Sequence, residues 1–373
     1  MSKKIAIIGA SYLQLPLVQR AKKMGIKTIC FAWAEGAVCK DVADTFYPIS
    51  IVEKEQILEI CKQEQIDGIC TIASDVAAPT VAYIAEQMGL VGNSYESALR
   101  ANNKYLMRQA FAASDVPCPI FKCLTQGVLT SEGVKEMGLP LIVKPSDRSG
   151  SLGVTKVERE EDLIPAIKAA QEYSFKHEAM VEQFIEGREI SVEFISYKGV
   201  HYPLQITDKV TTEAPHFVEI AHHQPADLSK AQYDEIYELT KRALTALGVT
   251  NGASHSEYRI TKDGKIYVME IGARMGGDFI GSDLVQLSTG YDFLRGVIEV
   301  ALGTFTEPKQ TEHNYSGVYF LSEATAYLKP IIEQHALPEI VKAEITDPEL
   351  HPLTCSGNRS GYLIYQANKK IEL

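Results

Sequence analysis

Two glutamates on neighbouring strand-like runs have the spacing that most directly suggests chemistry. Glu257 and Glu270 lie in the alternating runs 252–260 and 265–271, which a turn at 261–264 separates. In a hairpin closed by that turn, the two carboxylates stand opposite each other on one face. Facing carboxylates repel each other unless a cation lies between them. The pattern predicts a site for Mg²⁺ bound together with nucleotide phosphates, and two solvated strand glutamates are the plain alternative.

Basic residues accompany this pair. Arg274 follows Glu270 by four residues in an expected loop, where it can meet charge that develops on a phosphoryl group or a carboxylate substrate. Lys144 ends an apolar run and precedes the Gly/Ser-rich segment 146–153. Such a lysine can hold one phosphate while backbone N–H groups of the loop cover others. The spacing excludes a Walker-type loop, and a surface hairpin is the alternative.

Two further positions indicate a nucleotide. Lys104 precedes Lys144 by 40 residues, and the apolar run that begins at Val181 reaches Gly187 and resumes at Glu189. A bend of this kind can bind adenine through main-chain groups while Glu189 accepts hydrogen bonds from ribose hydroxyls.

The N-terminal glycine turn argues against a dinucleotide cofactor. The turn after the first apolar run reads Gly9-Ala-Ser-Tyr-Leu-Gln, and the second run ends Phe31-Ala-Trp. Both the GxGxxG pattern and the ribose-binding acid are therefore missing. Asp75, which follows the apolar run 68–72, is either a helix cap or a residue of a substrate cleft.

The elements that must position these residues change character along the chain. Strand, helix and strand alternate through residues 1–95, which predicts a parallel sheet with helices on its faces. One helical pattern at 96–112 precedes a small sheet-and-helix subdomain. Alternating runs and a long helix near 229–247 then predict a mostly antiparallel sheet. The segment 302–373 is expected to form a small third unit.

Composition and charge restrict the class of protein. The 373 residues carry a formal net charge of −11, so the long-range field repels nucleic acid and anionic lipid. No run reaches the roughly 18 apolar residues that span a bilayer. The seven cysteines include no CxxC pair, which favours a reduced cytoplasmic setting. We expect small-molecule partners, with no nucleic acid and no membrane.

Taken in chain order, these residues resemble the signature of the ATP-grasp superfamily. The resemblance covers about residues 1–300 and implies a multidomain α/β and α+β fold. A Rossmann-like, parallel α/β pre-ATP-grasp domain at 1–95 would precede a two-lobed ATP-grasp domain at 96–300. The nucleotide lid would lie at about 115–185, and a small C-terminal α/β unit at 301–373 would pack on the ATP-grasp domain.

The resemblance implies ATP with Mg²⁺, or alternatively Mn²⁺, as cofactors, and it gives each matching position a role. The nucleotide-binding positions would be Lys104, Lys144, Ser149, Ser151, Glu182, Gln183, Phe184, Ile185 and Glu189. Glu257 and Glu270 would hold the metal, and Arg274 and Lys144 would be catalytic. One position departs from the pattern, because many members place asparagine where this chain has Gly272.

Two strings are similar to the L-amino acid ligase branch. They are Glu-Ile-Gly-Ala-Arg-Met-Gly-Gly at 270–277 and Pro-His-Phe-Val-Glu-Ile-Ala-His at 215–222. This branch implies an ADP-forming ligase that joins a carboxylate to an amine through an acyl phosphate, with amino acids as substrates. The implied substrate residues are His216, Glu219, His222, Gly276, Gly277 and Asp278. A bicarbonate-using carboxylase or carbamoyl-phosphate-synthetase-like enzyme is the alternative, and a homodimer stays open.

Overall fold

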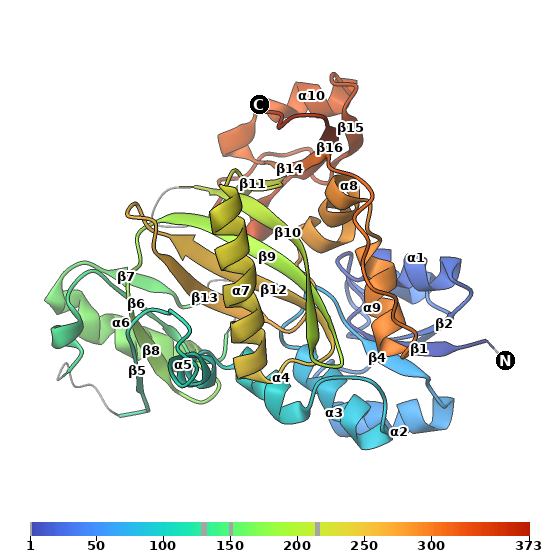
Figure 1. Ribbon diagram of the computed structural model, residues 1–373, viewed down its shortest axis with the longest axis horizontal. Helices are drawn as coiled ribbons and strands as arrows, with labels where there is room; N and C mark the ends of the chain where they lie inside the picture. The colour runs from blue at the N-terminus through green and yellow to red at the C-terminus, as the bar shows by residue number, and fades with distance from the viewer. Residues whose placement is uncertain (1, 128–132, 149–151, 213–216) are drawn as a thin grey trace.

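A computed structural model describes residues 2–127, 133–148, 152–212 and 217–373 (Figure 1). Within these residues the chain forms three β-sheets, one of them parallel and two antiparallel. The predicted combination of a parallel N-terminal α/β unit with antiparallel sheets is confirmed. None of the helices in the described ranges has the length and apolarity of a membrane-spanning segment.

The N-terminal sheet has the strand order β3-β2-β1-β4, and all of its pairs are parallel. The central strand β1 is buried along almost its whole length, as expected for a parallel strand covered on both faces. The elements are β1 Lys4–Ile8, α1 Leu15–Lys23, β2 Lys27–Phe31, β3 Thr45–Tyr47, α2 Lys54–Glu64, β4 Gly68–Cys70 and α3 Ala78–Met88.

The helical pattern at 96–112 forms two helices instead of one continuous helix, because the chain breaks at Asn103. Helix α4 spans Tyr95–Asn102 and α5 spans Lys104–Ala112, and Asn103 between them has an extended backbone. The Asn103 side chain accepts a hydrogen bond from the Leu106 amide and so caps α5. The break places Lys104 in the first turn of a new helix.

A small antiparallel sheet, ordered β5-β8-β6-β7, forms a lobe in the region where the sequence predicts the nucleotide lid, and we call it the lid lobe. Helix α6 covers one face of this sheet, and the two share a compact apolar core. The elements are β5 Phe121–Leu124, β6 Leu141–Pro145, β7 Thr155–Val157, α6 Glu160–Tyr173 and β8 Ala179–Gln183.

The large sheet has eight strands in the described ranges, in the order β13-β12-β9-β10-β11-β14-β16-β15. Helix α7 lies along one face of this sheet (Figure 1). The segment expected to form a small C-terminal unit contributes β14, β15 and β16 to the same sheet. The elements are β9 Arg188–Tyr197, β10 Val200–Thr211, β11 Glu219–Gln224, α7 Lys230–Leu247, β12 Gly252–Ile260, β13 Ile266–Gly272, α8 Val285–Thr289, α9 Phe293–Ala301, β14 Tyr315–Leu321, α10 Leu328–Gln334, β15 Ile340–Ile345 and β16 Gly361–Ala367.

Helix α9 joins the N-terminal sheet to the large sheet. Its buried residues share one apolar cluster with Ile5 and Ile7 of β1 and with Ile195 of β9. In Figure 1 the helix lies between the large sheet and β1 and β4. The N-terminal unit and the large sheet therefore do not have separate cores.

Candidate active site

The paired carboxylates stand where the sequence predicts them. Glu257 on β12 is the register partner of Glu270 on β13, with a bulge just beyond the pair. Two lysines from other elements reach them: Lys104 Nζ lies 2.9 Å from Glu270 Oε1, and Lys209 Nζ lies 2.8 Å from Glu257 Oε1. The prediction that the two glutamates stand opposite each other in a hairpin is confirmed.

Lys209 is a residue that the sequence reading missed. Its side chain is 4% exposed, and its Nζ also lies 2.7 Å from Glu189 and 3.3 Å from Glu219. Burial opposes the charged form, but the charges of Glu257, Glu189 and Glu219 raise the pKa of Lys209 well above its ordinary value. Lys209 lies near the end of β10, Val200–Thr211, where the cation reaches carboxylates from β9, β11 and β12.

Lys144 belongs to a buried cluster of charged side chains. Its Nζ lies 2.6 Å from Glu182 Oε2, and Arg108 Nε lies 2.8 Å from the other oxygen of Glu182. Arg108 Nη2 also donates to the Met269 carbonyl at 2.6 Å. Burial acts in the opposite sense, yet the charges of Arg108 and Lys144 lower the pKa of Glu182 to about 2. Burial lowers the pKa of Lys144 in spite of Glu182.

Lys104 connects this cluster to the paired carboxylates. Its Nζ bonds both to Glu270 and to the Arg148 carbonyl, the latter at 2.8 Å. Its backbone amide donates to the Ser146 carbonyl at 2.8 Å. Burial opposes the charge, but Glu270 raises the pKa of Lys104. The described part of the predicted phosphate loop therefore begins beside Lys104.

The segment predicted to face adenine, residues 182–185, is hydrogen-bonded to the residues that flank β5 and β6. The amides of Gln183 and Phe184 donate to the carbonyls of Ile120 and Pro140, at 2.9 and 3.1 Å. The Ile185 carbonyl accepts from Arg259 at 3.1 Å. Arg259 also lies 3.2 Å from Glu189, so it links the segment to the predicted ribose carboxylate.

A second buried carboxylate, Glu193, was also missed by the sequence reading. It is completely buried on β9, where it pairs with His255 Nδ1 and accepts the Gly276 amide at 3.1 Å. Burial lowers the pKa of His255, but Glu193 and Glu257 outweigh it and raise the pKa to about 9. The dyad lies between Glu257 and the loop that begins at Gly276.

The predicted substrate residues meet a residue from the C-terminal segment. Arg359 Nη1 donates to Asp278 at 2.8 Å, and Nη2 donates to the Glu219 carbonyl at 3.0 Å. His222 Nε2 lies 3.6 Å from Asp278. Gly277, Asp278 and Tyr12 line a small cavity. Arg359 was not foreseen, because its partners are 81 and 140 positions away in the chain.

Arg274 is held by the N-terminal unit. Its Nε and Nη2 donate to the two oxygens of Asp75 at 2.8 and 2.7 Å. Burial opposes the charge, but Asp75, Glu193 and Glu257 raise the pKa of Arg274. The guanidinium therefore lies within reach of the charges of Glu193 and Glu257. The Asp75 side chain binds Arg274 and does not cap helix α3.

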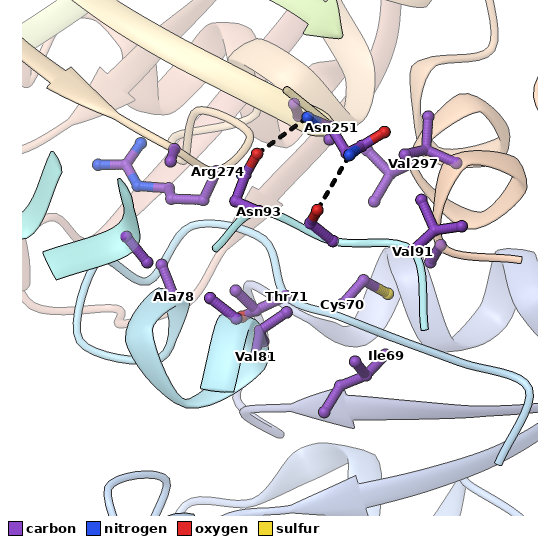
Figure 2. A pocket seen from close by; sticks show the side chains of 18 residues that line it. Ile69, Cys70, Thr71, Ala78, Val81, Val91, Asn93, Asn251, Arg274 and Val297 are labelled. Atoms are coloured by element: carbon purple, nitrogen blue, oxygen red, sulfur yellow. Dashed lines mark hydrogen bonds between the residues drawn. The ribbon is translucent and has the colours of Figure 1, made fainter. Parts of the chain in front are cut away.

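A cavity of about 60 Å³ is lined in part by Arg274. Figure 2 shows Arg274 at one edge, beside Asn93, with the Asn93–Asn251 hydrogen bond along the upper wall. The Asn251 side chain also donates to the Gly92 carbonyl at 2.9 Å. These bonds connect the N-terminal unit to the start of β12.

Three predicted residues, Ser149, Ser151 and His216, lie outside the described residues. The contacts and charge interactions given above bring most of the other predicted residues into one region. These residues are Lys104, Lys144, Glu182, Glu189, Glu219, Glu257, Glu270 and Arg274. Gly276 joins them through Glu193, and Asp278 and His222 join them through Arg359.

The donor set fits Mg²⁺ held largely by phosphate oxygens. Glu257 and Glu270 present hard oxygen ligands side by side, and about a third of each side chain is exposed. Within the described ranges, no three His, Cys, Asp or Glu side chains form a complete metal cage. Mg²⁺ commonly takes one or two carboxylates plus substrate phosphates, so a complete protein cage is not required.

Comparisons with known proteins point to one domain type. Residues 137–283 match the family model described as ATP-grasp domain. The alanine–anticapsin ligase of Bacillus subtilis (strain 168) is 29% identical over 263 residues, which cover 62% of this chain and 55% of that protein. The chain spans about half the length of the curated relatives that it matches first.

Solved structures share the fold over nearly the whole chain. The L-amino acid ligase from Bacillus licheniformis has a TM-score of 0.79 at 23% identity, covering 99% of this chain and 94% of that one. Phosphoribosylglycinamide synthetase from Anaerococcus prevotii has a TM-score of 0.79 at 21% identity, covering 99% and 95%. Likeness at this level of identity shows the fold.

Proposed function

Because the chain carries an ATP-grasp domain at residues 137–283, we propose that it is an ADP-forming ligase that joins a carboxylate to an amine through an acyl phosphate. One observation carries the proposal: Glu257 and Glu270 are register partners, and each is bonded by a buried lysine from a different element. The name of the alanine–anticapsin ligase supports amino-acid-like substrates.

In this proposal ATP lies between the lid lobe and the large sheet. Lys104 and Lys144 bind its phosphates, and the segment 182–185 faces adenine. Ser149 and Ser151 extend the phosphate contacts, and Glu189 accepts the ribose hydroxyls. Arg108 supports Lys144 indirectly, because it shares the Glu182 carboxylate with it.

Glu257 and Glu270 would hold Mg²⁺, with Mn²⁺ as a substitute. The ion neutralises charge on the ATP phosphates when it is bound. Lys209 and Lys104 already oppose the negative charge of these two carboxylates. The chain itself thus holds two lysines beside the proposed metal ligands, and positive charge is the main requirement of a phosphoryl-transfer site.

The reaction proceeds in two balanced steps. A substrate carboxylate oxygen attacks the γ-phosphorus, the bond to the bridging oxygen of ADP breaks, and an acyl phosphate forms. A neutral amine then attacks the acyl carbon, phosphate leaves with the bonding electrons, and the nitrogen loses a proton to give the amide. Arg274 faces the charge that develops in the first step, since Asp75 fixes its orientation.

The amino-acid end of the site would lie at the loop 276–278. Asp278 offers a carboxylate to a substrate ammonium, and the Gly276 and Gly277 amides lie beside it. Burial lowers the pKa of His222, so its imidazole is neutral near pH 7 and can accept a proton. Glu219, and His216 from the same stretch of sequence, complete this set. The proposal also includes a cytoplasmic location and allows a homodimer.

The test is ADP release from purified protein with ATP, Mg²⁺ and pairs of amino acids or small carboxylates. We expect release that depends on an amino acid, and an amide product in the same mixture. Release that responds to bicarbonate instead would support the carboxylase alternative, and no release in any mixture would contradict the ligase.

Variants at the charged residues test the site assignment. Lys144→Ala, Glu270→Gln and Arg274→Gln should each lower kcat by at least about a hundredfold, the scale of losing one charge-stabilising group. The matched control is Lys230→Ala, which removes an exposed lysine on α7 and should leave kcat unchanged. Wild-type rates in all three variants would refute the assignment.

A further inference from the structure

The Asp75–Arg274 ion pair crosses between two parts of the fold. Asp75 follows β4 of the parallel sheet, and Arg274 follows β13 of the large sheet. Both oxygens of the carboxylate are used, at 2.8 and 2.7 Å, and the two side chains are about 15% exposed. A bidentate pair fixes the plane of the guanidinium as well as its position.

Gly272 is placed so that this pair can form. A Cβ atom on residue 272 would lie 2.6 Å from Asp75 Oδ1 and 3.1 Å from Arg274 Cζ. The first separation is too short for any real side chain, and Asp75 cannot retreat without losing its bonds to Arg274. A side chain at position 272 and the bidentate pair therefore exclude each other.

Backbone contacts hold Asp75 at this place. Ile72 and Met275 form a parallel bridge, and the Ala73 amide donates to the Met275 carbonyl at 3.0 Å. The loops that carry Asp75 and Arg274 are thus joined next to the ion pair. The carboxylate is presented by a fixed backbone rather than by a free loop.

Arg274 borders free space as well as the Asp75 carboxylate. It borders the cavity of about 60 Å³ drawn in Figure 2, which is lined mainly by small apolar side chains. The Arg274 side chain is therefore not enclosed by packing on the side of this cavity. Its orientation depends instead on the bidentate pair with Asp75.

We propose that Asp75 is a positioning residue that aims Arg274 at the reacting phosphoryl group, and that residue 272 is glycine because only a missing side chain leaves room for the Asp75 carboxylate. This inference rests on the proposed function, since the orientation of Arg274 matters for the phosphoryl-transfer step. It also means that the N-terminal unit completes the catalytic site. The asparagine that the family resemblance leads one to expect at 272 is incompatible with this arrangement.

The kinetic test separates positioning from nucleotide binding. Asp75→Asn should lower kcat about ten- to a hundredfold, which is the scale of a misplaced catalytic group. The Kd of a non-hydrolysable ATP analogue should change less than about threefold, because the substitution removes no nucleotide contact. Formate should restore part of the activity of Asp75→Ala, because it supplies a carboxylate. Asp67→Asn, at an exposed ion pair of the same domain, is the matched control. A wild-type kcat in Asp75→Asn would overturn the proposal.

A second experiment tests the claim that a side chain at position 272 prevents the Asp75–Arg274 pair. Gly272→Asn should lose activity as Asp75→Ala does, and adding Gly272→Asn to Asp75→Ala should cost little more, because both changes break the same pair. Full activity of Gly272→Asn, or a second loss of equal size in the double variant, would refute it.

A stability measurement separates the failure of this inference from that of the proposed function. If wild-type protein turns over no substrate, the ligase fails, but the pair can still be tested by thermal unfolding of Asp75→Asn, Arg274→Gln and their combination. We expect clearly non-additive changes in Tm. Additive changes would show that the two residues are independent and would overturn the inference.

Discussion

Glu182 and Glu257 are both strand carboxylates bonded to a lysine, but their access to solvent differs. The Glu182 side chain is 1% exposed and lies between Arg108 and Lys144, whereas 32% of the Glu257 side chain is exposed beside Lys209. A fully buried carboxylate cannot exchange its cationic partners, because each unpaired charge would be left without solvation. A carboxylate at the edge of solvent can exchange a lysine for a ligand.

The two clusters therefore serve different purposes in the proposed site. The Glu182 cluster fixes Lys144 in the framework, and the Glu257 cluster is the part that can rearrange when nucleotide and metal bind. If substitution by glutamine changed stability and kcat equally at Glu182 and Glu257, this distinction would be contradicted.

The largest expected difference is in stability. Glu182→Gln should lower the free energy of unfolding by about 3–5 kcal/mol, because Arg108 and Lys144 are then left as two buried cations without an anion. Glu257→Gln should cost less than about 1 kcal/mol, as is typical of charges with solvent access. Urea unfolding of the two isosteric variants measures both values, and equal losses would contradict the comparison.

The pH dependence of stability should follow Glu182. Its pKa of about 2 in the folded protein lies below the roughly 4.3 of an unfolded chain. The ionised carboxylate thus contributes about 3 kcal/mol above roughly pH 4.3. This contribution is lost as the pH falls from there toward 2. Unfolding free energies measured across this range should fall less steeply for Glu182→Gln, and parallel curves for variant and wild type would argue against the assignment.

The effect of Glu257→Gln should appear in catalysis instead. We expect kcat to fall about a hundredfold, equivalent to about 2.7 kcal/mol of barrier, and the Mg²⁺ concentration for half-maximal rate to rise. Initial rates in a Mg²⁺ titration measure both quantities. An unchanged Mg²⁺ requirement would remove Glu257 from the metal site.

The sequence predicts well those parts of the site that depend on local pattern. The register of Glu257 with Glu270 follows from strand alternation and a short turn, and Lys144 follows from an apolar run that ends in proline. The break at Asn103 was missed because a helical period continues through it. An asparagine directly before Lys104 is a capping signal that could have located the break.

Residues that enter the site through long-range pairing could not be predicted in the same way. Lys209 and Glu193 lie within ordinary alternating strands, and their partners depend on which strands become neighbours. Arg359 reaches Asp278 only because β14 and β16 extend the large sheet. The pairing of Asp75 with Arg274 likewise requires two sheets to meet, which no local pattern specifies.

Helix α9 limits how the N-terminal unit could be exchanged between related enzymes. Residues 1–95 pack on α9, which the chain supplies some 200 positions later, and one apolar cluster contains β1, α9 and β9. A chimera that replaced only the first 95 residues would set a foreign surface against Phe293, Leu294 and Val297. The module that could be transplanted intact is discontinuous and includes the segment Phe293–Ala301.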